Sequence, residues 1–295
     1  MMSKRIAVLI TCFNRKQKTL DCLKALFNQV LIPEVSLQVY LVDDGSTDGT
    51  GEAVQQNYPQ VKVLQGDGNL FWNGGMRMAF DVACKDNPDF YLWLNDDTLL
   101  EPDALRTLLD TYYQLAETGE RKAIIAGSTR DPVTGVYTYG GKVQSRWWHP
   151  LNLDSVEPTE KPQRCDTMCG NCVLIPREVA QVVGNLDPAF VHYGGDWDYG
   201  LRAKQKGCTV WIAPGYQGTC PANPKPQKQT NVTLGERLHK VQQPKGLALE
   251  DVTLQPMKEW KVLTQRHAGF LWPIYWLLPY RRLLWLYIAG LLKKG

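Results

Sequence analysis

The chain has 295 residues, of which 44% are hydrophobic and 21% are charged. This composition excludes an intrinsically disordered chain, a collagen-like repeat and a small disulfide scaffold. The formal net charge of +3 is too small to indicate nucleic-acid binding by itself. The charge is unevenly spread, because residues 221–295 carry 12 Lys and Arg against 4 Asp and Glu. A basic C-terminal segment favours a partner with an anionic surface.

The first residues do not have the pattern of a signal peptide. The apolar run at residues 6–10 is short, and polar residues follow it at once. We therefore expect a cytoplasmic protein whose eight cysteines are thiols in a reducing compartment.

Apolar periodicity predicts strands that alternate with helices in the first part of the chain. The predicted strands are residues 5–11, 37–42, 61–64, 90–94 and 123–128. The predicted helices are 15–30, 48–58 and 102–117, with another that follows a loop at 66–75 and ends near residue 84. Asn14 is the candidate N-cap of the first helix. This alternation predicts an α/β fold with a mostly parallel sheet flanked by helices.

The composition changes near residue 221, where Pro, Gln and Lys predict a linker. A surface helix is expected at 233–242, followed by an aromatic-rich, basic helical tail. Arg281 and Arg282 split residues 268–295 into two apolar stretches, each shorter than the roughly 20 residues that span a bilayer. Trp and Tyr beside Arg and Lys favour contact with a membrane surface, with packing on the body as the alternative. We divide the chain into a domain at 1–225 and a tail at 226–295.

Polar residues directly follow three of the predicted strands. The first strand ends at Thr11, and Asn14 and Arg15 follow it beside Phe13. Asp43 and Asp44 follow the second strand, and Asn95, Asp96 and Asp97 follow the fourth. Ligands of open α/β sheets bind at the carboxyl ends of the strands. The N-terminus of the first helix offers N–H groups to phosphate, and paired carboxylates suit Mg²⁺ or Mn²⁺. Taken singly, each cluster is also typical of a helix cap or an acidic turn.

These segments, residues 8–15, 42–48 and 94–97, resemble the inverting family 2 glycosyltransferases, which have the GT-A fold. Three later segments extend the resemblance: the Asn- and Gly-rich residues 68–75, the Gly-led strand at 169–177 and the acidic segment 193–202. In order and spacing the resemblance covers about residues 4–220 and leans toward rhamnosyltransferases.

The resemblance implies a role for each matching residue. On the donor side, the residues implied to bind the nucleotide sugar are Thr11, Phe13, Asn14, Arg15, Asn73, Gly74 and Asp96. The residues implied to bind the uracil or thymine base and the ribose are Asp43 and Asp44. Asp97 is the implied metal ligand, and Asp196 is the implied catalytic base. Trp197, Asp198 and His192 are assigned to the acceptor side, although a structural role is favoured for His192.

The implied reaction is an inverting transfer from a UDP- or dTDP-sugar, with Mn²⁺ or Mg²⁺ as cofactor. The implied acceptor is a saccharide or a polyprenyl-linked saccharide, used in cell-surface polysaccharide synthesis. A carboxylate can take the proton of the attacking hydroxyl, and cationic groups stabilise the leaving diphosphate. With the tail on a membrane, the protein would be peripheral to the inner face of the cell membrane and would have no nucleic-acid partner.

The chain departs from the family pattern at three places. Asn95 replaces the first acid of the metal motif, and Gly195 stands where a Glu often precedes the base. The histidine that many members carry near the domain end is missing from residues 213–220. These departures leave two acids for a metal and alter the acceptor motif.

Rival functions come from other patterns. Cys165, Cys169 and Cys172 have the spacing of a radical S-adenosylmethionine iron–sulfur site. A nucleotidyltransferase would need a Gly-rich loop after the first strand, and none is present. A non-catalytic sugar-binding module would not need the retained Asp96, Asp97 and Asp196.

Overall fold

A computed structural model describes residues 4–30, 34–222, 234–243, 247–249, 252–254, 256–281, 283 and 285. The chain divides into two compact units, and these differ from a simple division at residue 225. The first unit comprises residues 1–143, 154–188 and 195–222. The second unit joins the segments 144–153 and 189–194 to residues 223–295.

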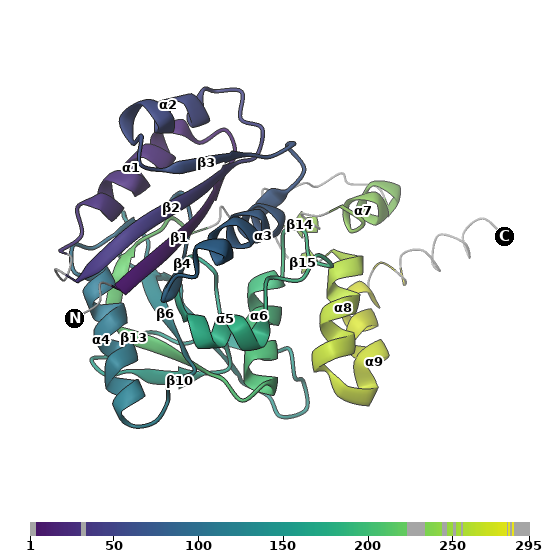
Figure 1. Cartoon of the computed structure of the whole chain (residues 1–295). Coiled ribbons are helices and arrows are strands. Elements are labelled where there is room, and N and C mark those ends of the chain that lie inside the picture. Colours follow the sequence, from purple (N-terminus) through teal and green to yellow (C-terminus); the bar gives the residue numbers. More distant parts are fainter. Residues whose placement is uncertain are drawn as a thin grey trace. The chain divides into compact units, whose positions relative to one another are not determined.

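The first unit alternates strands and helices (Figure 1). Its first half contains β1 (Lys4–Cys12), α1 (Lys16–Phe27), β2 (Val35–Asp43), α2 (Thr50–Asn57), β3 (Lys62–Gln65), α3 (Phe71–Ala83), the short η1 (Cys84–Asp86), β4 (Phe90–Leu94), β5 (Leu99–Leu100), α4 (Ala104–Glu117) and β6 (Ala123–Arg130). Its second half contains β7 (Tyr137–Tyr139), β8 (Gly141–Gln144), β9 (Leu153–Ser155), β10 (Gln163–Cys165), β11 (Thr167–Met168), β12 (Cys172–Pro176), α5 (Arg177–Val183), α6 (Gly195–Gln205) and β13 (Thr209–Thr219).

One large sheet has the strand order β10-β13-β6-β12-β4-β1-β2-β3. Neighbours β4, β1, β2 and β3 are parallel, as are β13 and β6. Strand β12 is antiparallel to both β4 and β6. A smaller sheet has the order β11-β8-β9. The predicted α/β class with a mostly parallel sheet is confirmed.

Helices cover both faces of the large sheet, so its central strands are buried on both sides. Along β1, Ile6, Val8 and Ile10 face the core with α1, α2 and α4, while Ala7 and Leu9 face the core with α3, α5 and α6. Side chains alternate between faces along a strand, and strands buried on both faces are apolar throughout. This explains why the continuous apolar runs predicted the strands within one or two residues of their ends.

The start of α3 differs from the sequence expectation. Residues 71–75 were expected in a loop, but the helix begins at Phe71. The carboxylate of Asp44 accepts hydrogen bonds from the N–H groups of Leu70 and Phe71, at 3.3 and 2.9 Å. A helix needs such acceptors at its first turn. Here the acceptor comes from a distant part of the chain, so local sequence could not reveal it.

The second unit contains mostly short helices. They are α7 (Leu234–Lys240), α8 (Met257–His267), η2 (Gly269–Leu271), α9 (Trp272–Leu277) and η3 (Leu278–Tyr280), with strands β14 (Leu247–Leu249) and β15 (Val252–Leu254). Helices α8 and α9 are joined by two indole hydrogen bonds, from Trp260 to the Tyr275 carbonyl and from Trp276 to the Met257 carbonyl, both 3.2 Å. The expected linker lies mostly outside the described residues, as does most of the second apolar stretch of the tail. No described helix is long and apolar enough to cross a bilayer.

Candidate active site

The loops after β1 and β2 are held together by hydrogen bonds. The Asn14 N–H donates to Ser46 Oγ at 2.9 Å, and Asn14 Oδ1 accepts from the Thr47 N–H at 2.7 Å. Asn14 was expected to cap α1, but it does not. Asp48 caps both helices, because its carboxylate accepts the N–H groups of Lys16 at 3.1 Å and Thr50 at 3.0 Å. Asn14 has the positive φ of 51°, a conformation that Asn tolerates better than most residues.

Asp43 and Asp44 point into the protein rather than into solvent. Asp43 Oδ1 accepts the Ser46 N–H at 2.9 Å, and Asp44 accepts the N–H groups of Gly68 and Phe71, each at 2.9 Å. Their exposed fractions are only 3% and 4%. Both carboxylates therefore shape the loops beside the sheet edge. Their expected contacts with base and ribose stay predictions.

Helix α3 packs closely on the end of β1. A Cβ added at Gly75 would lie 2.1 Å from Thr11 Oγ1, and one at Gly74 would lie 3.2 Å from the Cβ of Leu70. Asn73 is fully buried, and its side-chain amide donates to the Asp187 carbonyl at 2.9 Å. Phe13 is half exposed at the adjoining loop. The predicted donor residues thus lie in neighbouring loops, with Asn73 turned into the interior.

Arg15 bridges the two acids that follow β4. Its Nη1 lies 3.0 Å from Asp96 Oδ1 and 2.9 Å from Asp97 Oδ2. Asp96 is 4% exposed, and burial raises its pKa to about 6, with the charge of Arg15 opposing this rise. Arg15, which follows β1, therefore contacts Asp96 and Asp97, which follow β4, because these two parallel strands are neighbours in the sheet.

The chemistry of this acid pair fits a hard divalent cation. Asp96 Oδ2 is buried and has no hydrogen-bond partner among the described residues. Carboxylate oxygens are the ligands that Mg²⁺ and Mn²⁺ prefer, and one or two of them suffice where substrate phosphates complete the shell. No group of three His, Cys, Asp or Glu in the described parts of the chain could hold a metal ion. Any cation here would thus rely on Asp96, Asp97 and a bound phosphate ligand.

Trp72 links the loops that hold the predicted donor residues to the predicted acceptor motif. Its indole N–H donates to Asn95 Oδ1 at 2.7 Å, directly beside the acid pair. A Cβ added at Gly170 would lie 2.3 Å from the same indole, so the ring rests against this glycine. The Gly170 N–H in turn donates to Asp196 Oδ2 at 3.0 Å. A continuous series of contacts therefore runs from the start of α3, past the end of β4, to Asp196.

Asp196 lies in the first turn of α6, where N–H groups hold its carboxylate. Besides the Gly170 bond, the Trp197 N–H donates to Asp196 Oδ1 at 2.9 Å. Burial raises the pKa of Asp196 above its ordinary value, while these N–H groups and the charge of Lys142 oppose the rise. A fixed carboxylate with a raised pKa suits a general base.

The other residues of the acceptor motif have different surroundings. Trp197 lies beneath the Lys142 ammonium, 5.4 Å from ring centroid to nitrogen. The Asp198 carboxylate is fully buried and forms an ion pair of 2.7 Å with Arg202 one turn later. His192 belongs to the second unit, where its N–H lies 3.4 Å from Glu259 Oε1. The roles expected of these three side chains stay predictions.

Sequence reasoning missed Lys142 and Trp72 as parts of this region. Trp72 stands inside the Asn- and Gly-rich segment, so its position in the motif was the available signal. Lys142 lies on β8 in an irregular stretch and carries no local signal. Only the pairing of β8 with β11 brings it toward the acceptor motif.

The iron–sulfur alternative is overturned by the sheet order. Cys165 is on β10 and Cys172 is on β12, and two strands, β13 and β6, lie between them. With neighbouring strands about 4.8 Å apart, this order separates the two backbones by roughly 14 Å. All eight cysteines are free in the structure.

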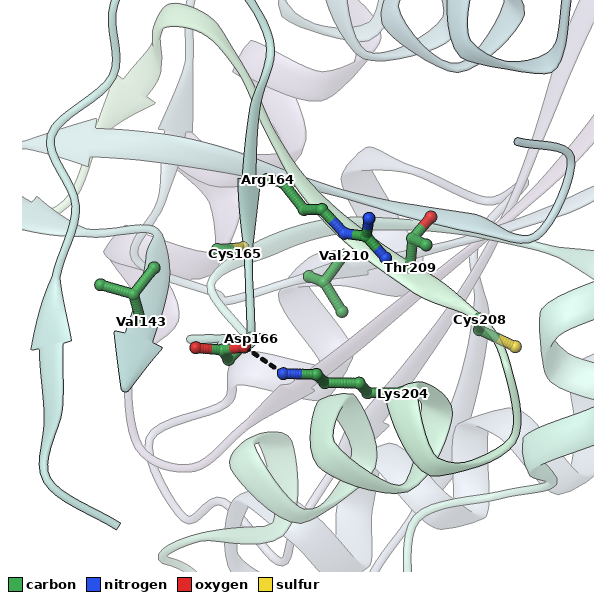
Figure 2. A pocket seen from close by; sticks show the side chains of 8 residues that line it. All are labelled: Val143, Arg164, Cys165, Asp166, Lys204, Cys208, Thr209 and Val210. Atoms are coloured by element: carbon green, nitrogen blue, oxygen red, sulfur yellow. Dashed lines mark hydrogen bonds and ion pairs between the residues drawn. The ribbon is translucent and has the colours of Figure 1, made fainter. Parts of the chain in front are cut away.

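A hollow of about 350 Å³ lies elsewhere in the first unit (Figure 2). It is lined by the start of β13 at Thr209 and by the ion pair between Lys204 and Asp166. The opposite end of β13, roughly 30 Å along the strand, leads to Cys220, whose Sγ is 3.5 Å from Asp97. This hollow therefore lies away from the acid pair that follows β4.

The chain is similar in sequence and in structure to known proteins. A family model described as glycosyl transferase family 2 matches residues 7–184. Over 208 residues the chain is 27% identical to the N-acetylglucosaminyl-diphospho-decaprenol L-rhamnosyltransferase of Mycobacterium tuberculosis. That match covers 62% of this chain and 65% of the relative, so the chain spans slightly less than two thirds of the relative's length.

Two solved structures share the fold at 14% sequence identity. The mannosyltransferase PcManGT from Pyrobaculum calidifontis, in complex with GDP-Man and Mn²⁺, has a TM-score of 0.54 over 95% of this chain and 70% of that one. GalNAc-T7 with UDP, GalNAc and Mn²⁺ has a TM-score of 0.58 over 81% of this chain and 48% of that one. The expected GT-A fold is confirmed by this likeness. With the family model matching more than half of its residues, the chain belongs to glycosyl transferase family 2.

Proposed function

We propose that this protein transfers one sugar, with inversion, from a nucleotide-diphosphate donor to a hydroxyl of a saccharide acceptor. The observation that carries the proposal is the series of contacts that joins Asn95, beside the two acids after β4, through Trp72 and Gly170 to Asp196. Family membership supports sugar transfer as the reaction class.

Asp196 is the proposed general base. Its two oxygens are held by the Gly170 and Trp197 N–H groups, so the carboxylate is oriented before the acceptor binds. A base that faces the sugar from the side opposite the leaving diphosphate gives a single displacement and an inverted anomeric centre. The carboxylate accepts the proton of the acceptor hydroxyl as the new glycosidic bond forms.

The donor diphosphate is proposed to bind beside Arg15 and the N-terminus of α1. The helix dipole and the guanidinium both favour negative charge there. Asp97, with Asp96, would hold a Mn²⁺ or Mg²⁺ ion, which stabilises the charge on the leaving diphosphate when bound. Both structural neighbours carry Mn²⁺ beside a nucleotide or nucleotide sugar, which supports a metal in this chain.

The acceptor is proposed to be a lipid-linked saccharide used in cell-surface polysaccharide synthesis. The rhamnosyltransferase relative is named for a decaprenol-linked substrate, which supports a polyprenyl-linked acceptor. The donor is proposed to be a dTDP- or UDP-sugar. The basic, aromatic C-terminal segment supports a cytoplasmic protein that is peripheral to the inner face of the cell membrane.

The test is a screen of UDP-, dTDP- and GDP-sugars with Mn²⁺, first by thermal shift and then by transfer to a polyprenyl-diphosphate saccharide. A bound donor stabilises the folded state by mass action. The anomeric configuration of the product is then read by NMR. Transfer with inversion is the expected result. Transfer with retention contradicts the mechanism, and donor binding without transfer or hydrolysis indicates a sugar-binding module instead.

A further inference from the structure

One face of α9 is apolar and exposed. Phe270, Ile274 and Leu277 have exposed fractions of 90%, 54% and 51%. Ile274 and Leu277 are three residues apart on α9 and so share one side of it, while Phe270 lies in the preceding η2. The opposite side is occupied, because Tyr275 is buried and Trp276 packs on α8. The helix is therefore apolar on both sides, and no described residue of the second unit covers the outer one.

The segment 144–153 adds two tryptophans to the second unit. Trp147 is 90% exposed and Trp148 is 47% exposed. The Tyr275 hydroxyl donates to the Trp148 carbonyl, and the His149 ring lies 4.8 Å from the Tyr275 ring. The segment is closed by a hydrogen bond of 3.0 Å from the Ser145 N–H to the Asn152 carbonyl. The buried side of α9 thus anchors an ordered loop that carries exposed indoles.

Cationic side chains accompany these aromatic rings. Arg146 lies over the Trp148 ring at 5.4 Å, and Lys261 lies over the Trp276 ring at 5.5 Å. Lys258 and Arg281 are also exposed. Among the described residues of this unit the acids are Glu236 and Glu259, and Glu259 is buried, where it accepts the Val191 N–H at 2.8 Å.

We propose that the second unit enters the interface of an anionic lipid bilayer through Trp147 and Trp148, with Ile274 and Leu277 of α9 as further apolar contacts. Indoles mixed with Lys and Arg match the boundary between acyl chains and anionic headgroups. The centre of a protein–protein interface is instead poor in charge and in Lys particularly. The inference rests on the proposed function, because a surface of this kind brings the enzyme to a lipid-linked acceptor.

The test is flotation of the full chain with vesicles of phosphatidylglycerol and phosphatidylcholine, against vesicles of phosphatidylcholine alone. The double variant Trp147→Ala/Trp148→Ala should lower the partition coefficient between vesicle and water at least about tenfold. The reason is that the variant lacks the two indoles that are buried in the bilayer interface. Val133→Ala is the matched control, since Val133 is also 90% exposed but lies in the first unit. The control should bind as the unchanged protein does.

Three outcomes overturn the inference. The first is binding by the double variant equal to that of the control, and the second is binding that does not depend on phosphatidylglycerol. The third is a dimer of the unchanged chain that the double variant converts to a monomer, which assigns the surface to a second copy. Melting temperature and far-UV circular dichroism verify that the variant folds. Flotation requires neither donor nor acceptor, so its result is independent of whether sugar transfer is found.

Discussion

The indole of Trp72 rests on Gly170, so that a Cβ added at Gly170 would lie only 2.3 Å from it. The ring has little freedom to move, because its N–H is bound to Asn95 at 2.7 Å. The same glycine donates its N–H to Asp196. One small residue thus sets the spacing between the acids after β4 and the candidate base.

Gly170→Ala should therefore lower transfer while also destabilising the fold. The new methyl group must push the indole or the β11–β12 connection away, and overpacking of this kind costs about 1–3 kcal/mol. Unfolding in urea measures the free-energy change, and kcat measures the displacement of the base. Gly235→Ala is the control, because nothing lies within 4 Å of a Cβ there. An unchanged kcat in the Gly170 variant would show that this contact does not position Asp196.

Asp97→Asn should weaken Mn²⁺ binding by at least about tenfold. Loss of a residue that only hydrogen-bonds to a metal ligand already has an effect of this size. The amide keeps the shape of the side chain but removes its charge. Calorimetric titration of Mn²⁺ in the presence of the nucleoside diphosphate measures the change. Asp110→Asn, an exposed acid on the outside of α4, should leave the affinity unaltered. Equal affinity in both variants would remove Asp97 from the proposed metal site.

Lys142→Gln should move the acidic limb of the kcat profile to higher pH. Asp196 must be deprotonated to act as a base, so transfer falls as pH falls through its raised pKa. The charge of Lys142 lowers that pKa, and its removal lets burial raise the pKa further. The neighbouring Cys169 thiol stays neutral near pH 7, since burial raises its pKa to about 11. A pH series of kcat, with exposed Lys85→Gln as control, measures the shift. A limb that stays in place, or moves to lower pH, contradicts the assignment.

Asp44→Asn should destabilise the first unit by about 1–3 kcal/mol, the cost of leaving a buried polar group unpaired. The Asp44 carboxylate accepts three backbone N–H groups, from Gly68, Leu70 and Phe71. The side-chain amide of Asn has an NH₂ group, which is a donor and would face some of these backbone N–H groups. Asp67→Asn is the control in the same loop, where an exposed carboxylate accepts only the Asn69 N–H. Urea unfolding compares the two, and equal losses would show that Asp44 does not hold the start of α3.

The strands of the first unit could be predicted from sequence because each is buried on both faces. Val8 and Leu9 face different helix layers and are both apolar, so the run is continuous. The N-terminus of α3 could not be predicted, since its cap comes from Asp44. The capping of α1 was missed for the same reason, because the capping side chain is Asp48 from the next loop.

The motifs located the candidate site but not its internal connections. Thr11, Asp44 and Asp97 could be expected at one sheet edge because they follow parallel strands. The contact of Trp72 with Gly170 depends on how two distant segments pack, and no local pattern encodes it. The contact between Tyr275 and Trp148, which joins residues 144–153 to the C-terminal segment, likewise depends on the packing of distant parts of the chain.

The most direct test of the account is single-turnover transfer by Asp196→Asn, with the donor dissociation constant measured alongside. The account predicts that transfer falls by about 100-fold or more, the size of a general-base contribution, while donor affinity is unchanged. Transfer at the rate of the unchanged protein would contradict it, because the proton of the acceptor hydroxyl would then be taken by another group.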